Sequence, residues 1–260
     1  MDFTLDKYRQ LLKALLKANY KFVTYSVYIS NPSADEKVII LRHDVDAKPE
    51  NSMKTAQIEK ELGVVATYYF RAVPESWNEP IIRQISSLGH EVGYHYESLT
   101  TCHGDVSAAY SDFIRNLERL RDLVTVSSIC MHGSPRSPYD SKDIWKSYDY
   151  FALNLVGEPY LDTDFSKIFY LTDTGRRWDG FKTSVRDKIP VYQEIWRING
   201  LVFHATDDLL LSIQNNKFPD KIMITTHPQR WTDNKLSWIK ELIFQRFKNC
   251  IKRLKLIFFK

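Results

Sequence analysis

The feature that most constrains the fold is a regular alternation of apolar runs and amphipathic segments between residues 38 and 131. The apolar runs, rich in β-branched and aromatic residues, predict buried strands at 38–41, 64–70, 90–95 and 126–131. The segments between them carry apolar residues at helical spacing, and two of them stop at Gly63 and Gly89. Strands alternating with helices at this spacing predict right-handed βαβ units and a parallel sheet, closed or nearly closed as a barrel.

The remaining chain is less regular. We expect an N-terminal amphipathic helix over 4–16, a short strand at 20–25 and a final helix from about 236. Further strands are predicted at 150–154, 168–171, 201–204 and 222–226, with a helix at 207–214. No internal repeat or linker separates these segments, so we predict a single domain spanning 1–260, with its core at about 37–231.

Composition excludes several classes of protein. Hydrophobic residues make up 43% of the chain, charged residues 26%, and the net charge is +4, which is ordinary for a globular protein and gives no reason to expect a nucleic-acid partner. Three cysteines at unrelated spacings, Cys102, Cys130 and Cys250, form no disulfide framework. The first residues lack the pattern of a secretory signal, and no apolar stretch reaches the roughly 18 residues of a membrane span. We therefore expect a cytoplasmic protein.

Ionisable residues follow the predicted strands at the points where these strands end. They are His43, Asp44 and Asp46, then His95 and Glu97, then His132, then Asp173 with Arg176 and Arg177, and finally His227 with Arg230. Because the carboxyl ends of parallel strands meet at one edge of a sheet, these groups are expected to gather on one rim. Two carboxylates two residues apart on a strand point the same way, and a cation would relieve their repulsion.

The order and spacing of five motifs resemble the polysaccharide deacetylase (NodB-type) family over about residues 37–231. The motifs are Asp44-Val45-Asp46, Gly89-His90-Glu91-Val92-Gly93-Tyr94-His95, the polar turn around Pro135, Asp173 to Trp178, and Thr226-His227-Pro228. The resemblance implies a metal-dependent amide hydrolase on an α/β, distorted (β/α)7-type barrel with mainly parallel strands, here with N- and C-terminal helical extensions. The chain looks most like a divergent bacterial subgroup found with surface-polysaccharide biosynthesis.

The resemblance also implies roles for individual residues. Asp44 would be the general base and His227 the general acid, while Asp46 and His95 would bind a divalent metal, most readily Zn²⁺. Trp178, and with it Trp231, would form an apolar wall for the substrate. Core packing is the alternative for both tryptophans.

One departure from the family pattern changes the expected ligand set. The family places a second metal histidine four residues after the first, and here that position is Leu99. His132 is the first candidate to replace it, and His103 is the second. Glu97 and His43 are also in range. Arg42 or Arg136 would take the role of the family's arginine that orients the catalytic base.

Further residues are assigned to substrate binding. They include Arg42, Arg136, Asp173 and Arg230. Arg176, Arg177, Arg186 and Arg230 add positive charge near the rim, which would suit an anionic substrate such as a phosphate-linked sugar. These arginines could instead neutralise Asp173, Asp179 and Asp187. Glu158 lies in a polar and aromatic segment typical of sugar-binding loops, and exposed loops explain that composition equally well.

The tail from residue 236 to residue 260 is a basic amphipathic stretch. It would either cover the barrel or lie on the anionic inner face of a membrane, as a peripheral contact. The sequence thus predicts a cytoplasmic enzyme that removes an N-acetyl or N-formyl group from an amino sugar, free or linked to a lipid or nucleotide. The alternatives are a glycan- or nucleotide-sugar-binding protein without catalysis, and a hydrolase of non-sugar amides.

Overall fold

A parallel β-sheet forms the centre of the protein. The computed structural model describes residues 1–31, 37–134, 137–182, 184 and 187–258. The strands within these ranges are β1 (Lys21–Val23), β2 (Val38–Val45), β3 (Thr67–Phe70), β4 (Glu91–Tyr96), β5 (Val126–Met131), β6 (Phe169–Thr172) and β7 (Lys221–Thr226). Their order is β5-β4-β3-β2-β7-β6, with β1 beside the first half of β2, and each of these pairings is parallel. The predicted α/β class with mainly parallel strands is confirmed.

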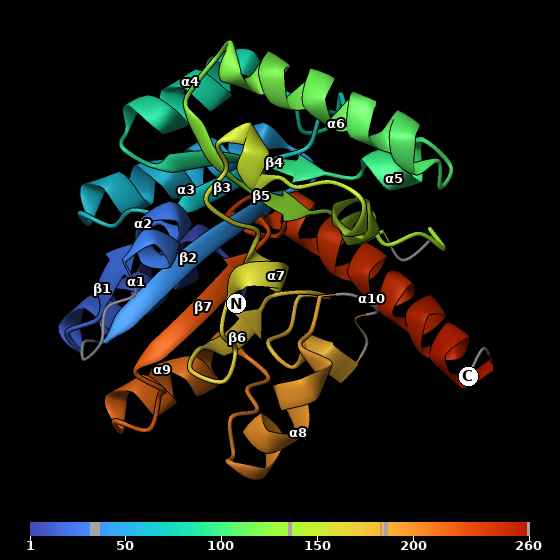
Figure 1. The fold of residues 1–260 in the computed structure, drawn as a ribbon. Coiled ribbons are helices and arrows are strands. Elements are labelled where there is room, and N and C mark those ends of the chain that lie inside the picture. The colour runs from blue at the N-terminus through green and yellow to red at the C-terminus, as the bar shows by residue number, and fades with distance from the viewer. Residues whose placement is uncertain (32–36, 135–136, 183, 185–186, 259–260) are drawn as a thin grey trace.

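Helices surround the sheet (Figure 1). The α-helices are α1 (Leu5–Lys17), α2 (Tyr25–Ser30), α3 (Pro49–Glu61), α4 (Glu79–Ser87), α5 (Ser98–Thr101), α6 (Val106–Arg121), α7 (Pro159–Asp162), α8 (Pro190–Ile198), α9 (Thr206–Gln214) and α10 (Lys235–Phe258). Single 3₁₀ turns are η1 (Ser141–Lys146), η2 (Phe151–Leu153), η3 (Gly180–Lys182) and η4 (Pro228–Arg230). Local chemistry sets several helix starts: Asp105, for example, accepts a hydrogen bond from the backbone of Ala108 and caps α6.

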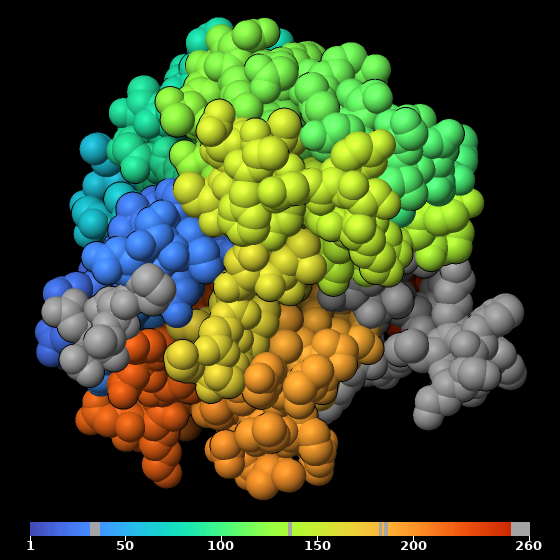
Figure 2. All heavy atoms as spheres, in the orientation of Figure 1, coloured from blue at the N-terminus to red at the C-terminus, as the bar shows by residue number. Residues whose placement is uncertain are grey.

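The sheet curves so that its two ends face each other. After β5 the chain returns beside this strand, where the Val156 backbone donates to the Ser127 carbonyl at 2.8 Å. Inside the curve, Arg42 of β2 donates to the Tyr160 hydroxyl at 2.9 Å, which lies 3.0 Å from the Tyr170 hydroxyl of β6. Figure 2 shows the yellow segment around residues 150–165 over the middle of one face. The fold is therefore barrel-like, with the segment around α7 between β5 and β6.

The face of β2 away from the barrel interior carries a buried polar network. The Glu59 carboxylate of α3 lies 2.7 Å from His43 Nε2, accepts from the Tyr68 hydroxyl at 2.8 Å, and also accepts from the Tyr8 hydroxyl. Burial alone would raise the pKa of Glu59, but His43 and His90 outweigh it and lower that pKa below its ordinary value. These bonds fasten α1 and α3 to the sheet.

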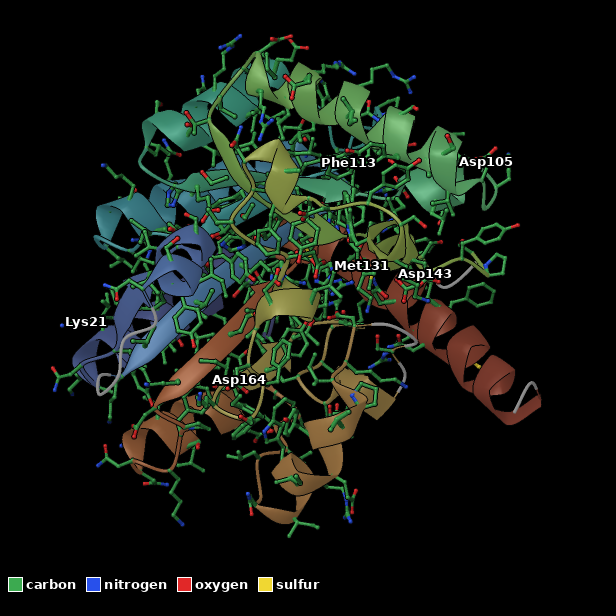
Figure 3. All side chains as sticks on the ribbon, viewed as in Figure 1. Lys21, Asp105, Phe113, Met131, Asp143 and Asp164 are labelled. Carbon is green, nitrogen blue, oxygen red and sulfur yellow. The ribbon has the colours of Figure 1, made fainter. Side chains whose placement is uncertain are left out.

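Further along the same outer face of the sheet, α6 packs on β4 through Phe113. This side chain, labelled in Figure 3, contacts the rings of Tyr94 and Tyr96 at 5.3 and 5.4 Å between centroids. Met131 ends β5 near the centre of the same view. These helices cover the outer face of the sheet, and the carboxyl ends of β2, β4 and β5 form the edge that carries polar side chains.

Two predicted strands are wrong. Residues 150–154 contain η2 because the Asp149 carboxylate accepts from the Phe151 backbone and Asn154 adopts a left-handed conformation that ends the turn. Residues 201–204 lead from α8 to α9 without strand pairing in the described chain. Helix α8 was not predicted. Its apolar residues Val191, Ile195 and Ile198 recur at helical spacing, but they face solvent and the helix buries little of this side.

Candidate active site

Three candidate metal ligands meet at the carboxyl ends of the strands. His95 lies near the end of β4, while Asp46 and His132 directly follow the ends of β2 and β5. Asp46 Oδ1 lies 3.7 Å from His95 Nε2 and 3.4 Å from His132 Nε2. The His95 side chain is buried, whereas those of Asp46 and His132 are 25% and 17% exposed, so the cluster opens to solvent on their side. The predicted rim thus brings these three side chains together.

The buried carbonyl of Cys130 orients His95. His95 Nδ1 lies 2.9 Å from this carbonyl oxygen, which can only accept, so Nδ1 carries the proton. Burial, assisted by His132, lowers the pKa of His95 to about 4. At neutral pH the ring is therefore uncharged, and the Nε2 lone pair points toward Asp44 and Asp46.

A series of polar contacts through Glu97 and Arg71 orients His132. Its Nδ1 lies 2.9 Å from Glu97 Oε2, and the other oxygen of Glu97 accepts from Arg71 at 2.6 Å. Arg71 also donates to the Asp46 carbonyl at 3.1 Å. Burial would raise the pKa of Glu97, but His132 and Arg71 lower it to about 2. Carboxylate–histidine pairs of this kind typically orient metal ligands.

The cluster has the properties of a cation site. Asp46 Oδ1 is shielded from water and accepts no hydrogen bond from any residue in the described ranges, while Oδ2 accepts from Gln229 at 3.1 Å. A buried carboxylate oxygen without a donor is costly unless a cation binds it. Two imidazole nitrogens and a carboxylate are ligands that Zn²⁺ and related divalent ions prefer. The residues present therefore fit a divalent metal.

Asp44 lies beside this cluster and is held by Arg42. The guanidinium donates from Nε to Oδ1 at 3.0 Å and from a terminal nitrogen to Oδ2 at 2.9 Å, and the His95 Nε2 is 3.8 Å from Oδ2. Arg42 thus lies where a base-orienting arginine is needed. The side chain has no exposed surface, and its assignment to substrate binding stays a prediction.

His227 lies on the other side of Asp46, with Nε2 3.9 Å from Asp46 Oδ2. Its Nδ1 lies 2.6 Å from Asp173 Oδ1. Burial and the Arg230 guanidinium oppose protonation, but Asp173 and Asp46 outweigh them and raise the pKa of His227. Asp173 is fully buried and also accepts from Arg230 at 2.6 Å. Asp173 and Arg230 therefore position His227, while their assignment to substrate binding stays a prediction.

Two other predicted substrate residues, Glu158 and Trp178, have buried side chains. Glu158 is buried and caps α7, accepting from the Tyr160 and Leu161 backbones at 2.6 and 3.0 Å. Burial raises the pKa of Glu158 to about 7. Trp178 is 3% exposed and, like the fully buried Trp231, belongs to the core. Arg136 and Arg186 lie outside the described residues.

The alternatives to His132 do not reach the cluster. Leu99 is buried at 3% exposure, and His103 is exposed between α5 and α6. His43 points to the opposite face of β2, toward Glu59. Glu97 contacts the site through His132. His132 is thus the candidate that the geometry favours.

Sequence reasoning named Asp187 only as a possible partner of the arginines near the rim; the residue lies before α8 and contacts side chains inside the barrel. It accepts from Thr172 at 2.8 Å and Tyr160 at 3.0 Å, and also from the hydroxyls of Tyr170 and Thr174. Burial would raise the pKa of Asp187, but His227 and these hydroxyls lower it to about 2. No motif surrounds Asp187, so the sequence offered no signal for its place inside the barrel.

Comparison with known proteins gives structural matches at low sequence identity and low TM-score. No protein-family model and no curated protein matches the chain. Among solved structures, it is similar to BA3943 of Bacillus anthracis, described as a CE4 family pseudoenzyme, at 15% identity and a TM-score of 0.42, over 85% of this chain and 63% of that one. It is also similar to PdaA of Bacillus subtilis, described as a family 4 carbohydrate esterase, at 14% identity and a TM-score of 0.42, over 92% and 84% of the two chains.

A BA3943 mutant described as having restored enzymatic activity matches at 14% identity, a TM-score of 0.42, and 85% and 65% coverage. The chain thus spans just under two thirds of the length of both BA3943 structures. By their descriptions, all three matches belong to carbohydrate esterase family 4. At such identities and TM-scores they carry no inference about activity, and the functional proposal depends on the residues of this chain.

Proposed function

We propose that this protein is a metal-dependent amide hydrolase that removes an N-acetyl or N-formyl group from an amino sugar. The observation that carries the proposal is the approach of His95 and His132 to Asp46 Oδ1, a buried oxygen for which the described residues supply no donor. Asp44 and His227 lie on either side. Asp46, His95 and His132 would hold the divalent metal, with Zn²⁺ as the first choice.

The flanking residues supply the two proton transfers of hydrolysis. A bound metal would lower the pKa of water and polarise the amide carbonyl. Asp44, oriented by Arg42, accepts the proton of the attacking water, and the new C–O bond forms as the amide C–N bond breaks. His227 donates a proton from Nε2 to the departing nitrogen, and the Asp173 and Asp46 carboxylates, which raise the pKa of His227, favour the protonated form. The products are the free acid and the amine.

The choice of an amino sugar follows from the sequence resemblance. We propose a cytoplasmic role in surface-glycan assembly, with the sugar free or linked to a lipid or nucleotide. The solvent-exposed side of Asp46 and His132 supports access for a substrate. A panel of N-acetylated amino sugars and simple N-acetyl amides, assayed for acetate release, would separate the sugar proposal from hydrolysis of other amides.

Metal content of the untagged protein is the first test. We expect near-stoichiometric divalent metal in the wild type, and loss of most of it in His95→Ala and in His132→Ala. His103→Ala is the matched control, because His103 is exposed and lies outside the candidate cluster. Full metal content in the His132 variant would exclude His132 as the replacement ligand.

One observation favours a second candidate function. The position of the family's second metal histidine is Leu99, which is buried in the core. A protein that had lost its metal but kept the barrel would bind a glycan or nucleotide sugar without hydrolysing it. If the wild type takes up no zinc, cobalt or nickel during incubation, this second function becomes the better account.

A further inference from the structure

Helix α10 packs on the body of the protein through a largely polar face. Gln245 on this face is 7% exposed, and Asn249 donates to the Gly175 carbonyl at 3.0 Å. Arg176 donates to the Trp238 carbonyl at 3.0 Å. Trp238, Glu241, Gln245 and Asn249 are three or four residues apart, which places them on one side of the helix.

The opposite side of α10 is apolar and exposed. The exposed fractions are 72% for Leu236, 47% for Ile239, 63% for Ile243, 51% for Phe244 and 65% for Phe247. Spacings of three and four residues join these side chains into one apolar stripe, defined here as Leu236, Ile239, Ile243, Phe244 and Phe247. Helices of globular proteins normally bury their apolar face and expose their polar one. Here the arrangement is inverted, so the stripe is suited to contact an apolar surface outside the protein.

The charges on α10 indicate what kind of apolar surface this is. Its sequence holds seven lysines and arginines and one acid, Glu241. Glu241 belongs to the packed face, where it lies 3.8 Å from Lys48. Lys240 and Arg246 lie beside the apolar stripe and are exposed. Apolar side chains flanked by basic ones are typical of helices that lie in the headgroup region of anionic membranes.

We propose that α10 binds the surface of an anionic lipid bilayer, with the apolar stripe inserted between the headgroups and Lys240 and Arg246 among the phosphates. A second copy of the chain fits less well, because a symmetric pair would bring two strongly basic helices together. Among the described helices, none is long and apolar enough to cross a membrane, so the contact is peripheral. Figure 1 shows α10 projecting beyond the other elements toward its C-terminal end, which leaves room for a flat surface. The proposal is independent of the proposed hydrolysis.

Vesicle binding tests this proposal, and Cys250 supplies the probe. This thiol is exposed near the apolar stripe, whereas Cys130 is buried, so the Cys102→Ser protein can be labelled at Cys250 with an environment-sensitive fluorophore. We expect a blue shift and co-sedimentation with vesicles containing phosphatidylserine, little of either with pure phosphatidylcholine, and weakening by salt. Ile243→Glu with Phe247→Glu should reduce partition at least about tenfold, from the apolar area lost.

Helix α8 offers a matched control. Ile195 and Ile198 are 51% and 71% exposed on a helix without a comparable run of basic residues. Ile195→Glu with Ile198→Glu should leave vesicle binding unchanged. The proposal is overturned if the wild type ignores anionic vesicles, if both double variants lose binding equally, or if light scattering shows a dimer that only the Ile243 and Phe247 changes dissociate. Metal content measured on the same variants keeps this outcome separate from the fate of the hydrolase proposal.

Discussion

Glu97→Gln is the most informative substitution near the candidate metal site. Glu97 is not one of the three candidate ligands, but it pairs with the ligand His132 at Nδ1 (2.9 Å) and with Arg71 (2.6 Å). Its pKa of about 2 means that it is fully ionised at neutral pH. Glutamine keeps the shape and removes the charge, so His132 becomes a weaker and less well oriented ligand. Second-layer changes of this kind typically weaken metal binding by about 10- to 100-fold, or about 1.4–2.7 kcal/mol.

A competition titration against a chromophoric zinc chelator measures this affinity. Cobalt absorption then reports whether the ligand geometry is kept. Glu79→Gln is the control, because Glu79 pairs with Arg119 on the exposed surface at 3.5 Å and should leave metal affinity unchanged. Equal affinities for the wild type and Glu97→Gln, with both proteins folded, would refute the claim that Glu97 supports a metal ligand.

Three further substitutions test the site and the core. Asp173→Asn should lower the pKa of His227, so the alkaline limb of the pH–rate profile moves to lower pH. Glu59→Gln should cost about 3 kcal/mol in urea unfolding. Because the folded-state pKa of Glu59 is lowered, its stabilising effect is present above its ordinary pKa of 4.5 and is lost as pH falls through the folded value, and the variant should lack this acid-side loss. Gly93→Ala should cost about 1–3 kcal/mol, since its Cβ would lie 2.4 Å from the Tyr69 ring.

Each of these three predictions would be contradicted by a specific result. An unchanged alkaline limb in Asp173→Asn would assign the titration to a group other than His227. Glu61→Gln is the control for Glu59→Gln, because Glu61 lies two residues further along the chain and is exposed. Equal unfolding free energies for the Glu59 and Glu61 variants would contradict the importance of the buried network. An unaltered stability of Gly93→Ala would mean that the strands can move apart at this position.

The strands from 38 to 131 and the rim that they form could be predicted from the sequence. Buried parallel strands have a strong apolar signal, and adjacent parallel strands bring their carboxyl ends together whatever the details of packing. Asp46, His95 and His132 were therefore placed together correctly before any contact was known. Their roles remain predictions until metal is measured.

Side-chain burial was harder to predict. Glu158 and Trp178 were expected to face a substrate, yet one caps a buried helix and the other fills the core. Whether a polar residue in a loop faces solvent or satisfies backbone donors depends on which layers close over it, and a local pattern does not contain that information. The contacts of Asp187 come from Thr172 of β6, Thr174 just after β6 and Tyr160 of α7, so they exist only in the assembled barrel.

Side chains alternate between the two faces of β2, so correct folding and the geometry of the candidate site depend on the same strand register. Arg42 and Asp44 point to the barrel interior, whereas His43 points to Glu59 on the other face. A one-residue slip of this strand would exchange the two faces, which would separate His43 from Glu59 and carry Arg42 away from Tyr160. Arg42 therefore protects the strand register as well as the geometry of Asp44. Variants at Arg42 that lose activity should be checked first for mispaired or aggregated protein, because some of that loss would arise during folding and not during catalysis.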